Sequence, residues 1–344
     1  MLKRGSKKTR QLPQKPKPKN PSPRFYYLWP QNNCTMSLLV IGTVAFDEVE
    51  TPFASSGRII GGAATYVSLA ASYFLKSGIH LVSVVGDDFP ESGIEHFHRR
   101  GISTEGLQIK AGEKSFFWRG RYRSDMNSRD TLETQLNVLA DFNPVLPESA
   151  KECDFLMLGN LMPSLQRSVL QQMNRRPKLV VLDTMNFWMD SAWDDLIDTL
   201  TMVDVLTIND EEARQLSGEF SLVKAARKIL SMGPRYLVIK KGENGALLFH
   251  QNEIFYAPAL PLEEVFDPTG AGDSFAGGFI GFLASQSEIN FETMKQAVIY
   301  GSAIASFCVE KFGIERVINL EPQELSDRIR QFVRLVDFSI QPGN

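Results

Sequence analysis

Cysteine is scarce in this sequence, which has only Cys34, Cys153 and Cys308 among its 344 residues. Three widely separated thiols do not provide a disulfide framework or a zinc site, so a reducing, cytoplasmic setting is expected. Histidine is also scarce, and its closest pair, His96 and His98, would not share a helix face. No apolar run approaches the roughly 18 residues that span a bilayer, and no signal-peptide pattern occurs, so no membrane partner is expected.

Basic residues are in deficit outside a short N-terminal segment. Residues 1–35 hold nine Lys and Arg, six prolines and no acid, whereas the whole chain has 37 basic and 40 acidic residues. The remainder therefore carries 28 basic residues against 40 acidic ones, a net charge of −12. This acidic body argues against a nucleic-acid partner, because phosphate backbones bind basic faces. We interpret residues 1–35 as a disordered basic tail or a mis-assigned start upstream of Met36; an organellar presequence and a nucleic-acid-binding tail are the alternatives.

Short apolar runs, each followed by a helical stretch, recur along most of the remaining chain. Alternation of this kind predicts an α/β fold, a doubly wound, mostly parallel sheet flanked by helices, formed by residues 36–340. The predicted strands are residues 38–42, 81–85, 155–158, 179–183, 203–208 and 237–241.

The alternation of strands and helices is interrupted between residues 107 and 142. From Phe116 to Arg123, aromatic residues alternate with mostly basic ones, and residues 132–140 repeat the period of two. This period predicts antiparallel strands that leave the main sheet. We expect a small β-sheet lid within about residues 44–56 and 107–142; the alternative is an edge hairpin with a solvated basic side.

The most informative stretch is residues 267–279, DPTGAGDSFAGGF. Proline and two glycines predict a tight turn, and the residues after it predict a helix. A helix start of this kind leaves backbone N–H groups free and so favours an anion. Asp273 would place a carboxylate at the anion, and phosphoryl transfer to an alcohol needs both groups. The alternative is that Asp273 only caps the helix.

No other nucleotide motif competes with this stretch, since the chain lacks Gly-x-x-x-x-Gly-Lys-Ser/Thr. The whole string resembles the signature of the ribokinase-like (PfkB) family of carbohydrate and nucleoside kinases. The resemblance implies a ribokinase-like fold with a small β-sheet lid, and transfer of the γ-phosphate of ATP to a primary hydroxyl. It implies that Asp273 is the general base and that the amides of Gly270, Ala271 and Gly272 form an anion hole.

The resemblance assigns further roles to residues that follow predicted strands. It implies that Asn209 and Glu212 organise Mg²⁺ through water, with Asn209 also beside the nucleotide, and that Asp267 is a candidate for the neighbourhood of a monovalent ion such as K⁺. It implies that Lys240, Gly242, Gly245 and Gly301 lie on the nucleotide side, and that Asp47, Gly61, Gly62 and Tyr66 lie on the acceptor side. Taken alone, Asn209 and Glu212 have the simpler interpretation of a helix cap, and the glycines that of turn formers.

Several positions depart from the family's pattern. Ala45 and Tyr66 stand where Asn is frequent, Lys240 stands where Thr is frequent, and Gly301 replaces a polar residue. These departures leave the acceptor open between a sugar, which needs polar side chains, and a nucleoside, whose base would pack on aromatics such as Tyr66 or Phe187. A catalytically silent sensor or assembly subunit is the alternative from another class. Two copies pairing through the lid is a further expectation.

Overall fold

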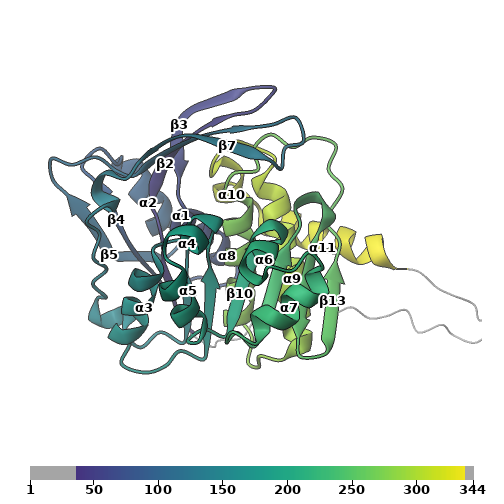
Figure 1. The fold of residues 1–344 in the computed structure, drawn as a ribbon. Helices are drawn as coiled ribbons and strands as arrows, with labels where there is room; N and C mark the ends of the chain where they lie inside the picture. The colour runs from purple at the N-terminus through teal and green to yellow at the C-terminus, as the bar shows by residue number, and fades with distance from the viewer. Residues whose placement is uncertain (1–35, 338–344) are drawn as a thin grey trace, which may run out of the picture. The chain divides into compact units, whose positions relative to one another are not determined.

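The computed structural model describes residues 36–337, so the predicted tail at residues 1–35 lies outside the described part of the chain. The main sheet has nine strands in the order β13-β12-β11-β10-β9-β8-β1-β4-β5 (Figure 1). Neighbouring strands from β5 to β11 are parallel, and β12 and β13 add an antiparallel edge. The strands are β1 (Leu38–Ile41), β4 (Ile79–Gly86), β5 (Ile102–Lys110), β8 (Phe155–Leu158), β9 (Leu179–Asp183), β10 (Val205–Asn209), β11 (Tyr236–Lys240), β12 (Ala246–His250) and β13 (Glu253–Ala257).

Helices cover both faces of this sheet. Alternate strand residues such as Leu39 and Ile41 share one core with α3, α5, α6 and α7, while α1, α8 and α9 contact strands from the other face. Central strands are therefore buried on both faces and mostly apolar, as in β1, where all four residues are buried. The helices are α1 (Ala63–Ala71), α2 (Glu91–Arg99), α3 (Pro163–Gln172), α4 (Asn186–Ser191), α5 (Trp193–Leu200), α6 (Asp210–Ser217), α7 (Leu222–Leu230), α8 (Ala271–Ala284), α9 (Phe291–Cys308), α10 (Glu315–Ile318) and α11 (Pro322–Val336).

A second sheet of four strands, in the order β3-β2-β6-β7, lies across one edge of the main sheet (Figure 1). Its strands are β2 (Ala45–Glu50), β3 (Ser55–Gly61), β6 (Phe117–Tyr122) and β7 (Arg129–Gln135), and we call it the small sheet. The predicted α/β fold with a small second sheet is thereby confirmed.

The limits of the small sheet differ in detail from the expectation. Strand β3 continues to Gly61, whereas residues 107–110 belong to β5 of the main sheet. Strands β2 and β6 pair in parallel, so the small sheet is not wholly antiparallel. Residues 137–139, predicted to continue the alternation, form a short 3₁₀ helix instead. Among the described residues, no helix is both long enough and apolar enough to cross a membrane.

Candidate active site

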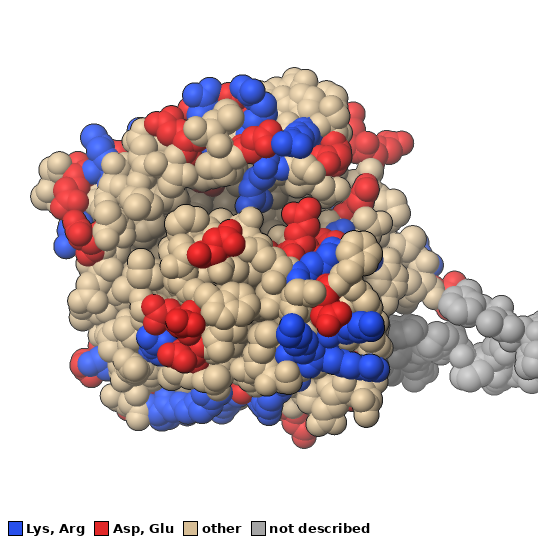
Figure 2. All heavy atoms as spheres, viewed as in Figure 1, with Lys and Arg blue, Asp and Glu red and all other residues tan. Residues whose placement is uncertain are grey.

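The predicted site residues gather at the carboxyl edge of the main sheet. The strand order reverses at β1, which has β4 on one side and β8 on the other, and open parallel sheets bind ligands beyond such a point. Asp183, Asn209 and Lys240 are the last residues of β9, β10 and β11. Figure 2 shows a hollow between the small sheet and the body below it, and we call this space the cleft.

Helix α8 begins directly after the turn of residues 267–270. Its N-cap, Gly270, has φ 75° and ψ −1°, a left-handed conformation that favours glycine. Of the three amides predicted to bind an anion, that of Ala271 donates to the Pro268 carbonyl at 3.1 Å. The amides of Gly270 and Gly272 have no hydrogen-bond partner among the described residues. Free N–H groups at the positive end of a long helix make this turn suited to an anion.

Tyr66 packs directly beneath this turn. A Cβ on Gly270 would lie 2.4 Å from the Tyr66 ring, so only glycine at this position leaves room for the ring. The Tyr66 side chain is buried, and its hydroxyl has no hydrogen-bond partner among the described residues. A buried, unpartnered hydroxyl is costly unless a ligand satisfies it.

Asp273 lies in the first turn of α8 and is a half-buried carboxylate. Burial, followed by the charge of Asp183, raises its pKa to about 6, although Lys240 and Arg129 act in the opposite direction. A carboxyl with this pKa is mostly ionised at neutral pH and remains basic enough to accept a proton.

Asp47 lies on β2 and is a buried carboxylate of the cleft. Burial, followed by the charges of Asp267 and Asp273, raises its pKa to about 7. The backbone of Gly61 can approach the Asp47 carboxylate closely because glycine has no side chain. A Cβ at this position would lie 1.8 Å from Asp47 Oδ2. Gly62 has φ 94° and is the N-cap of α1, and its N–H acts on the Asp47 carboxylate.

Asp267 is fully buried and holds the turn together. Its Oδ1 accepts the Thr269 N–H at 2.8 Å, and its Oδ2 accepts the Gly313 N–H at 3.1 Å. Each carboxylate oxygen therefore has a backbone partner already. These contacts give Asp267 a structural role, and its role beside K⁺ stays a prediction.

Asn209 and Glu212 form a capping box at the start of α6. The Asn209 side chain accepts the Glu212 N–H, and the Glu212 Oε2 accepts the Asn209 N–H, both at 2.8 Å. The simpler interpretation of these residues as a helix cap is therefore correct as far as it goes. Glu212 Oε1 has no hydrogen-bond partner in the described part of the chain, and burial raises the pKa of this carboxyl to about 7. No cluster of three or more His, Cys, Asp or Glu side chains suited to a metal occurs within residues 36–337.

Lys240 pairs with Asp183 below the start of α8. The Nζ atom lies 3.4 Å from both carboxylate oxygens of Asp183. A Cβ on Gly272 would lie 3.3 Å from the same Nζ, so the ammonium group is beside the first turn of α8. Burial would lower the pKa of Lys240, but the charges of Asp183, Glu212 and Asp273 raise it, and the lysine stays protonated.

The loop between β11 and β12 carries the glycines predicted for the nucleotide side. Gly242 has φ 53° and Gly245 has φ 77°. A Cβ on Gly242 would lie 2.5 Å from Asn127 Oδ1, which belongs to the turn between β6 and β7. The hairpin of the small sheet therefore extends across the cleft to this loop.

A sequence model of the PfkB family of carbohydrate kinases matches residues 37–319, most of the chain. The chain belongs to the PfkB family. This assignment confirms the prediction of a PfkB-type phosphotransferase with an alcohol group as acceptor.

Two curated relatives of this PfkB chain are nucleoside kinases. A cytidine kinase of Thermococcus kodakarensis is 28% identical over 250 residues, covering 71% of this chain and 87% of the relative. A nucleoside kinase of Methanothermobacter thermautotrophicus is 26% identical over 307 residues, covering 81% of this chain and 91% of the relative.

Solved structures share the PfkB fold at low sequence identity. The nucleoside kinase of Methanocaldococcus jannaschii superposes with a TM-score of 0.68 at 19% identity, covering 86% of this chain and 99% of that one. The aminoimidazole riboside kinase of Salmonella enterica has a TM-score of 0.68 at 21% identity, with 85% and 99% covered. At these identities the similarity shows the fold alone.

Gly301, predicted to lie beside the nucleotide, is instead packed between two helices of this structure. It lies inside α9, and a Cβ there would meet the Phe275 carbonyl oxygen at 2.7 Å. Its visible function is to let α8 and α9 pack closely. A role beside the nucleotide stays a prediction.

Sequence reasoning missed three contributions to the cleft. The first is the ion pair of Lys240 with Asp183, and the second is Arg129, whose charge reaches Asp273. The third is Tyr122, whose hydroxyl accepts a hydrogen bond from Thr269 Oγ1 at 3.2 Å. Only the alternation through β6 gave a signal, because it places Trp118 and Tyr122 on one face of that strand.

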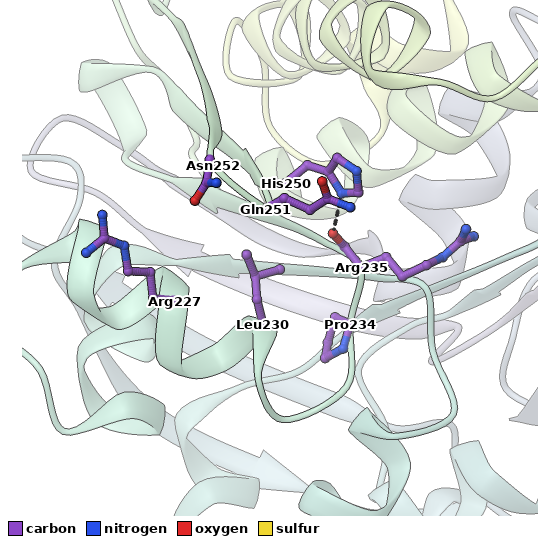
Figure 3. A pocket seen from close by; sticks show the side chains of 7 residues that line it. All are labelled: Arg227, Leu230, Pro234, Arg235, His250, Gln251 and Asn252. Atoms are coloured by element: carbon purple, nitrogen blue, oxygen red, sulfur yellow. Dashed lines mark hydrogen bonds between the residues drawn. The ribbon is translucent and has the colours of Figure 1, made fainter.

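A separate surface hollow of about 380 Å³ lies far from this site, at the amino end of β11 (Figure 3). His250 Nδ1 is hydrogen-bonded to the Arg235 carbonyl at its edge. The residues lining it are Arg227, Leu230, Pro234, Arg235, His250, Gln251 and Asn252. This hollow is at the opposite end of the strands from the cleft, whereas ligands of open parallel sheets bind beyond the carboxyl ends.

Proposed function

We propose that the protein transfers the γ-phosphate of ATP to a primary hydroxyl of a ribonucleoside or sugar, with Asp273 as the general base. The observation that carries this proposal is the position of Asp273. It is a half-buried carboxylate in the first turn of α8, next to the free amides of Gly270 and Gly272, and its charge acts on Asp47. One position thus combines a proton acceptor with groups that bind the phosphoryl oxygens.

The acceptor is held from the side of the small sheet and α1. Asp47 accepts or shares a proton with an acceptor hydroxyl, and Gly61 and Gly62 bring the backbone close enough for further hydrogen bonds. The unpartnered hydroxyl of Tyr66 gives the site one more donor. These contacts orient the reacting oxygen toward Asp273 and the phosphorus.

The transfer step needs positive potential at the phosphoryl group. Asp273 takes the proton of the hydroxyl as its oxygen attacks the γ-phosphorus in line, and ADP leaves. The amides at the start of α8 and the Lys240 ammonium stabilise the oxygens that carry the developing charge. Mg²⁺, with Glu212 and Asn209 as outer partners through water, would neutralise charge on the ATP phosphates.

The small sheet serves as the lid in this proposal. Its edge strand β7 is exposed at all seven residues, and an exposed edge is also where a second copy would pair. Light scattering on the full chain tests pairing, and a monomer at all concentrations contradicts it. Covering the cleft excludes water and so limits hydrolysis of ATP.

The test is an ADP-release assay over cytidine, adenosine, inosine, ribose and fructose, with nucleosides first because two relatives are nucleoside kinases. Asp273→Asn keeps the shape of the side chain but cannot accept the proton, and we expect at least a 100-fold loss of kcat with ATP binding intact. Near wild-type turnover by this variant would show that Asp273 is not the base. ATP binding without turnover of any acceptor would favour the sensor alternative.

A further inference from the structure

Strand β13 ends the main sheet, and one of its faces is open beside α7 (Figure 1). Ile254 stands opposite Phe249, and Tyr256 stands opposite Leu247. Cross-strand partners share a face, and Phe249 and Leu247 belong to the core that also contains α7 residues. Ile254 and Tyr256 are nevertheless each 53% exposed. The apolar face of the sheet therefore continues one strand beyond the helix that covers it.

The outer edge of β13 has no partner strand within residues 36–337. Alternate N–H and C=O groups of its five residues therefore point out of the sheet. Proteins commonly protect such an edge with charged side chains on the strand, but the one charge of β13 is Glu253, at its first position. Its exposed face carries Ile254 and Tyr256 instead. An edge of this kind is suited to pair with an added strand.

A groove between α7 and the β12–β13 hairpin runs up to the Ile254 side chain. It is a hollow of about 110 Å³ that adjoins the hollow of about 380 Å³ described above, since Arg227 and Leu230 line both. No acidic side chain is among the residues that line either hollow. The apolar walls of the groove are Val223, Ala226, Leu230, Phe249 and Ile254.

The charged side chains around the open face of β13 are mainly cations without partners. Lys224, Arg227 and Lys228 are exposed on α7, and none of them forms an ion pair within the described part of the chain. Figure 3 shows Arg227 projecting from α7 toward the side of Asn252. At the other end of β13, Lys241 Nζ lies 5.9 Å from the centre of the Tyr256 ring. Cations thus stand near both ends of the edge strand, although the chain beyond residue 35 has a net charge of −12.

The simpler explanation is that these cations stabilise α7. Arg227 and Lys228 lie in its last turn, where positive charge complements the helix dipole. Lys224 lies in the first turn, where the same dipole disfavours it, and Lys241 lies outside the helix. The helix dipole also gives no reason for the exposed apolar side chains of β13.

We propose that β13 and the groove beside α7 form a docking surface for an acidic segment of a partner protein, which adds to β13 as a strand. This inference does not depend on the proposed function. The main chain of the segment pairs with the free edge, and its apolar side chains pack on Ile254 and Tyr256. Its acidic side chains lie near Arg227 at one end and Lys241 at the other.

Two other occupants fit this surface less well, because neither supplies negative charge. Antiparallel pairing of two β13 strands about a two-fold axis would place both α7 helices, with their unpaired cations, on the same face of the joined sheet. Of the chain's own terminal segments, residues 1–35 are basic and residues 338–344 have no acidic side chain. An acidic partner provides the complementary charge that these occupants lack.

The experiment selects a random dodecapeptide phage library against the wild-type chain and titrates the most enriched peptide by fluorescence anisotropy. We expect this peptide to combine acidic residues with alternating apolar ones. Its affinity should fall about tenfold or more for Ile254→Lys and for Arg227→Glu. The matched controls, which should bind like the wild type, are Ile109→Lys, at a 59% exposed position of the opposite edge strand β5, and Lys76→Glu, at an exposed position without an ion pair in the described chain.

Strand addition has a signature that binding in the groove alone lacks. Hydrogen exchange of the amides in residues 253–257 should slow when the peptide binds, because the added strand accepts hydrogen bonds from the outward N–H groups. Proline at a central position of the peptide should weaken binding more than alanine there, since proline has no N–H to donate.

Four results would overturn the inference. The first two are a selection that enriches no peptide and one that enriches peptides without acidic residues. The third is an enriched peptide that binds Ile254→Lys as tightly as wild type or leaves exchange at residues 253–257 unchanged. The fourth is a dimer in light scattering that Ile254→Lys dissociates and Ile109→Lys does not, which would assign the edge to a second copy.

Discussion

Asp47→Asn is expected to make the protein more stable and less active. In the folded chain, burial and the charges of Asp267 and Asp273 raise the pKa of Asp47 to about 7, against an ordinary value of 3.8. Keeping this carboxylate ionised at neutral pH therefore opposes folding. Asparagine has nearly the same shape and can still accept the Gly62 N–H, but it carries no charge.

The magnitude follows from the difference in pKa. About three pH units at 1.36 kcal/mol each correspond to about 4 kcal/mol at pH 8, where the carboxyl is ionised in both folded and unfolded chains. The folded chain binds the proton more tightly than the unfolded chain between pH 3.8 and 7. The destabilisation of the wild type by Asp47 therefore grows as pH rises through this window. At pH 4 it is less than about 1 kcal/mol. The same substitution should raise KM for the acceptor, because it weakens the grip on its hydroxyl.

Urea unfolding at pH 4 to 8, followed by tryptophan fluorescence, measures the effect. Asp88→Asn is a control of opposite sign: burial would raise the pKa of Asp88, but hydrogen bonds from Ser115 and the charge of Arg58 lower it below 3.8. Its ionised form stabilises the fold above that value, so the control should lose about 1 to 3 kcal/mol at neutral pH and little at low pH. If Asp47→Asn were no more stable than wild type at pH 8, or if the gain did not change with pH, the reasoning would be refuted.

Three further predictions concern the α8 turn and its surroundings. Gly270→Ala should lose about 2 to 4 kcal/mol in urea unfolding, because its φ is 75° and the new Cβ meets the Tyr66 ring; unchanged stability would contradict this. Lys240→Met should lose about 3 to 5 kcal/mol at pH 8 by leaving Asp183 without its partner, and adding Asp183→Asn should recover most of it. Finally, kcat/KM should fall about tenfold per pH unit below pH 6, since Asp273 must be ionised to act as base. A rate that is flat from pH 5 to 8 would exclude that role.

The main sheet was predictable because its central strands are buried on both faces. Strands β1 and β9 consist almost entirely of apolar residues, and the pattern of runs and helices identified the fold class. The order of the strands was not predictable, because nothing in the apolar runs says which neighbour each one takes. The parallel pairing of β2 with β6 could not be predicted for the same reason, since it joins segments about 70 residues apart.

Some residues of the candidate site could be predicted from local sequence patterns, and others could not. The turn before Asp273 and the cap of Asn209 with Glu212 are local patterns, so sequence reasoning found them. Arg129 is different, because a bulge in the β6–β7 ladder, between the partners of Arg119 and Gly120, interrupts the period of two in β7. The alternation alone could not show which arginine faces the cleft.

Asp47 and Asp273, the two carboxylates of the proposed mechanism, differ in pKa. Burial raises the pKa of both groups: at Asp273 the charges of Lys240 and Arg129 act against it and the pKa is about 6, whereas at Asp47 the charges of Asp267 and Asp273 add to it, Arg129 acts against it, and the pKa is about 7. At pH 7 roughly nine in ten Asp273 side chains would be ionised, but only about half of those at position 47. This difference suits the proposed roles, in which Asp273 accepts the proton beside the phosphoryl group and Asp47 shares one with the acceptor's hydroxyl. The Lys240 ammonium acts on Asp273 and is not among the charges that act on Asp47, which is why we propose Asp273 as the base.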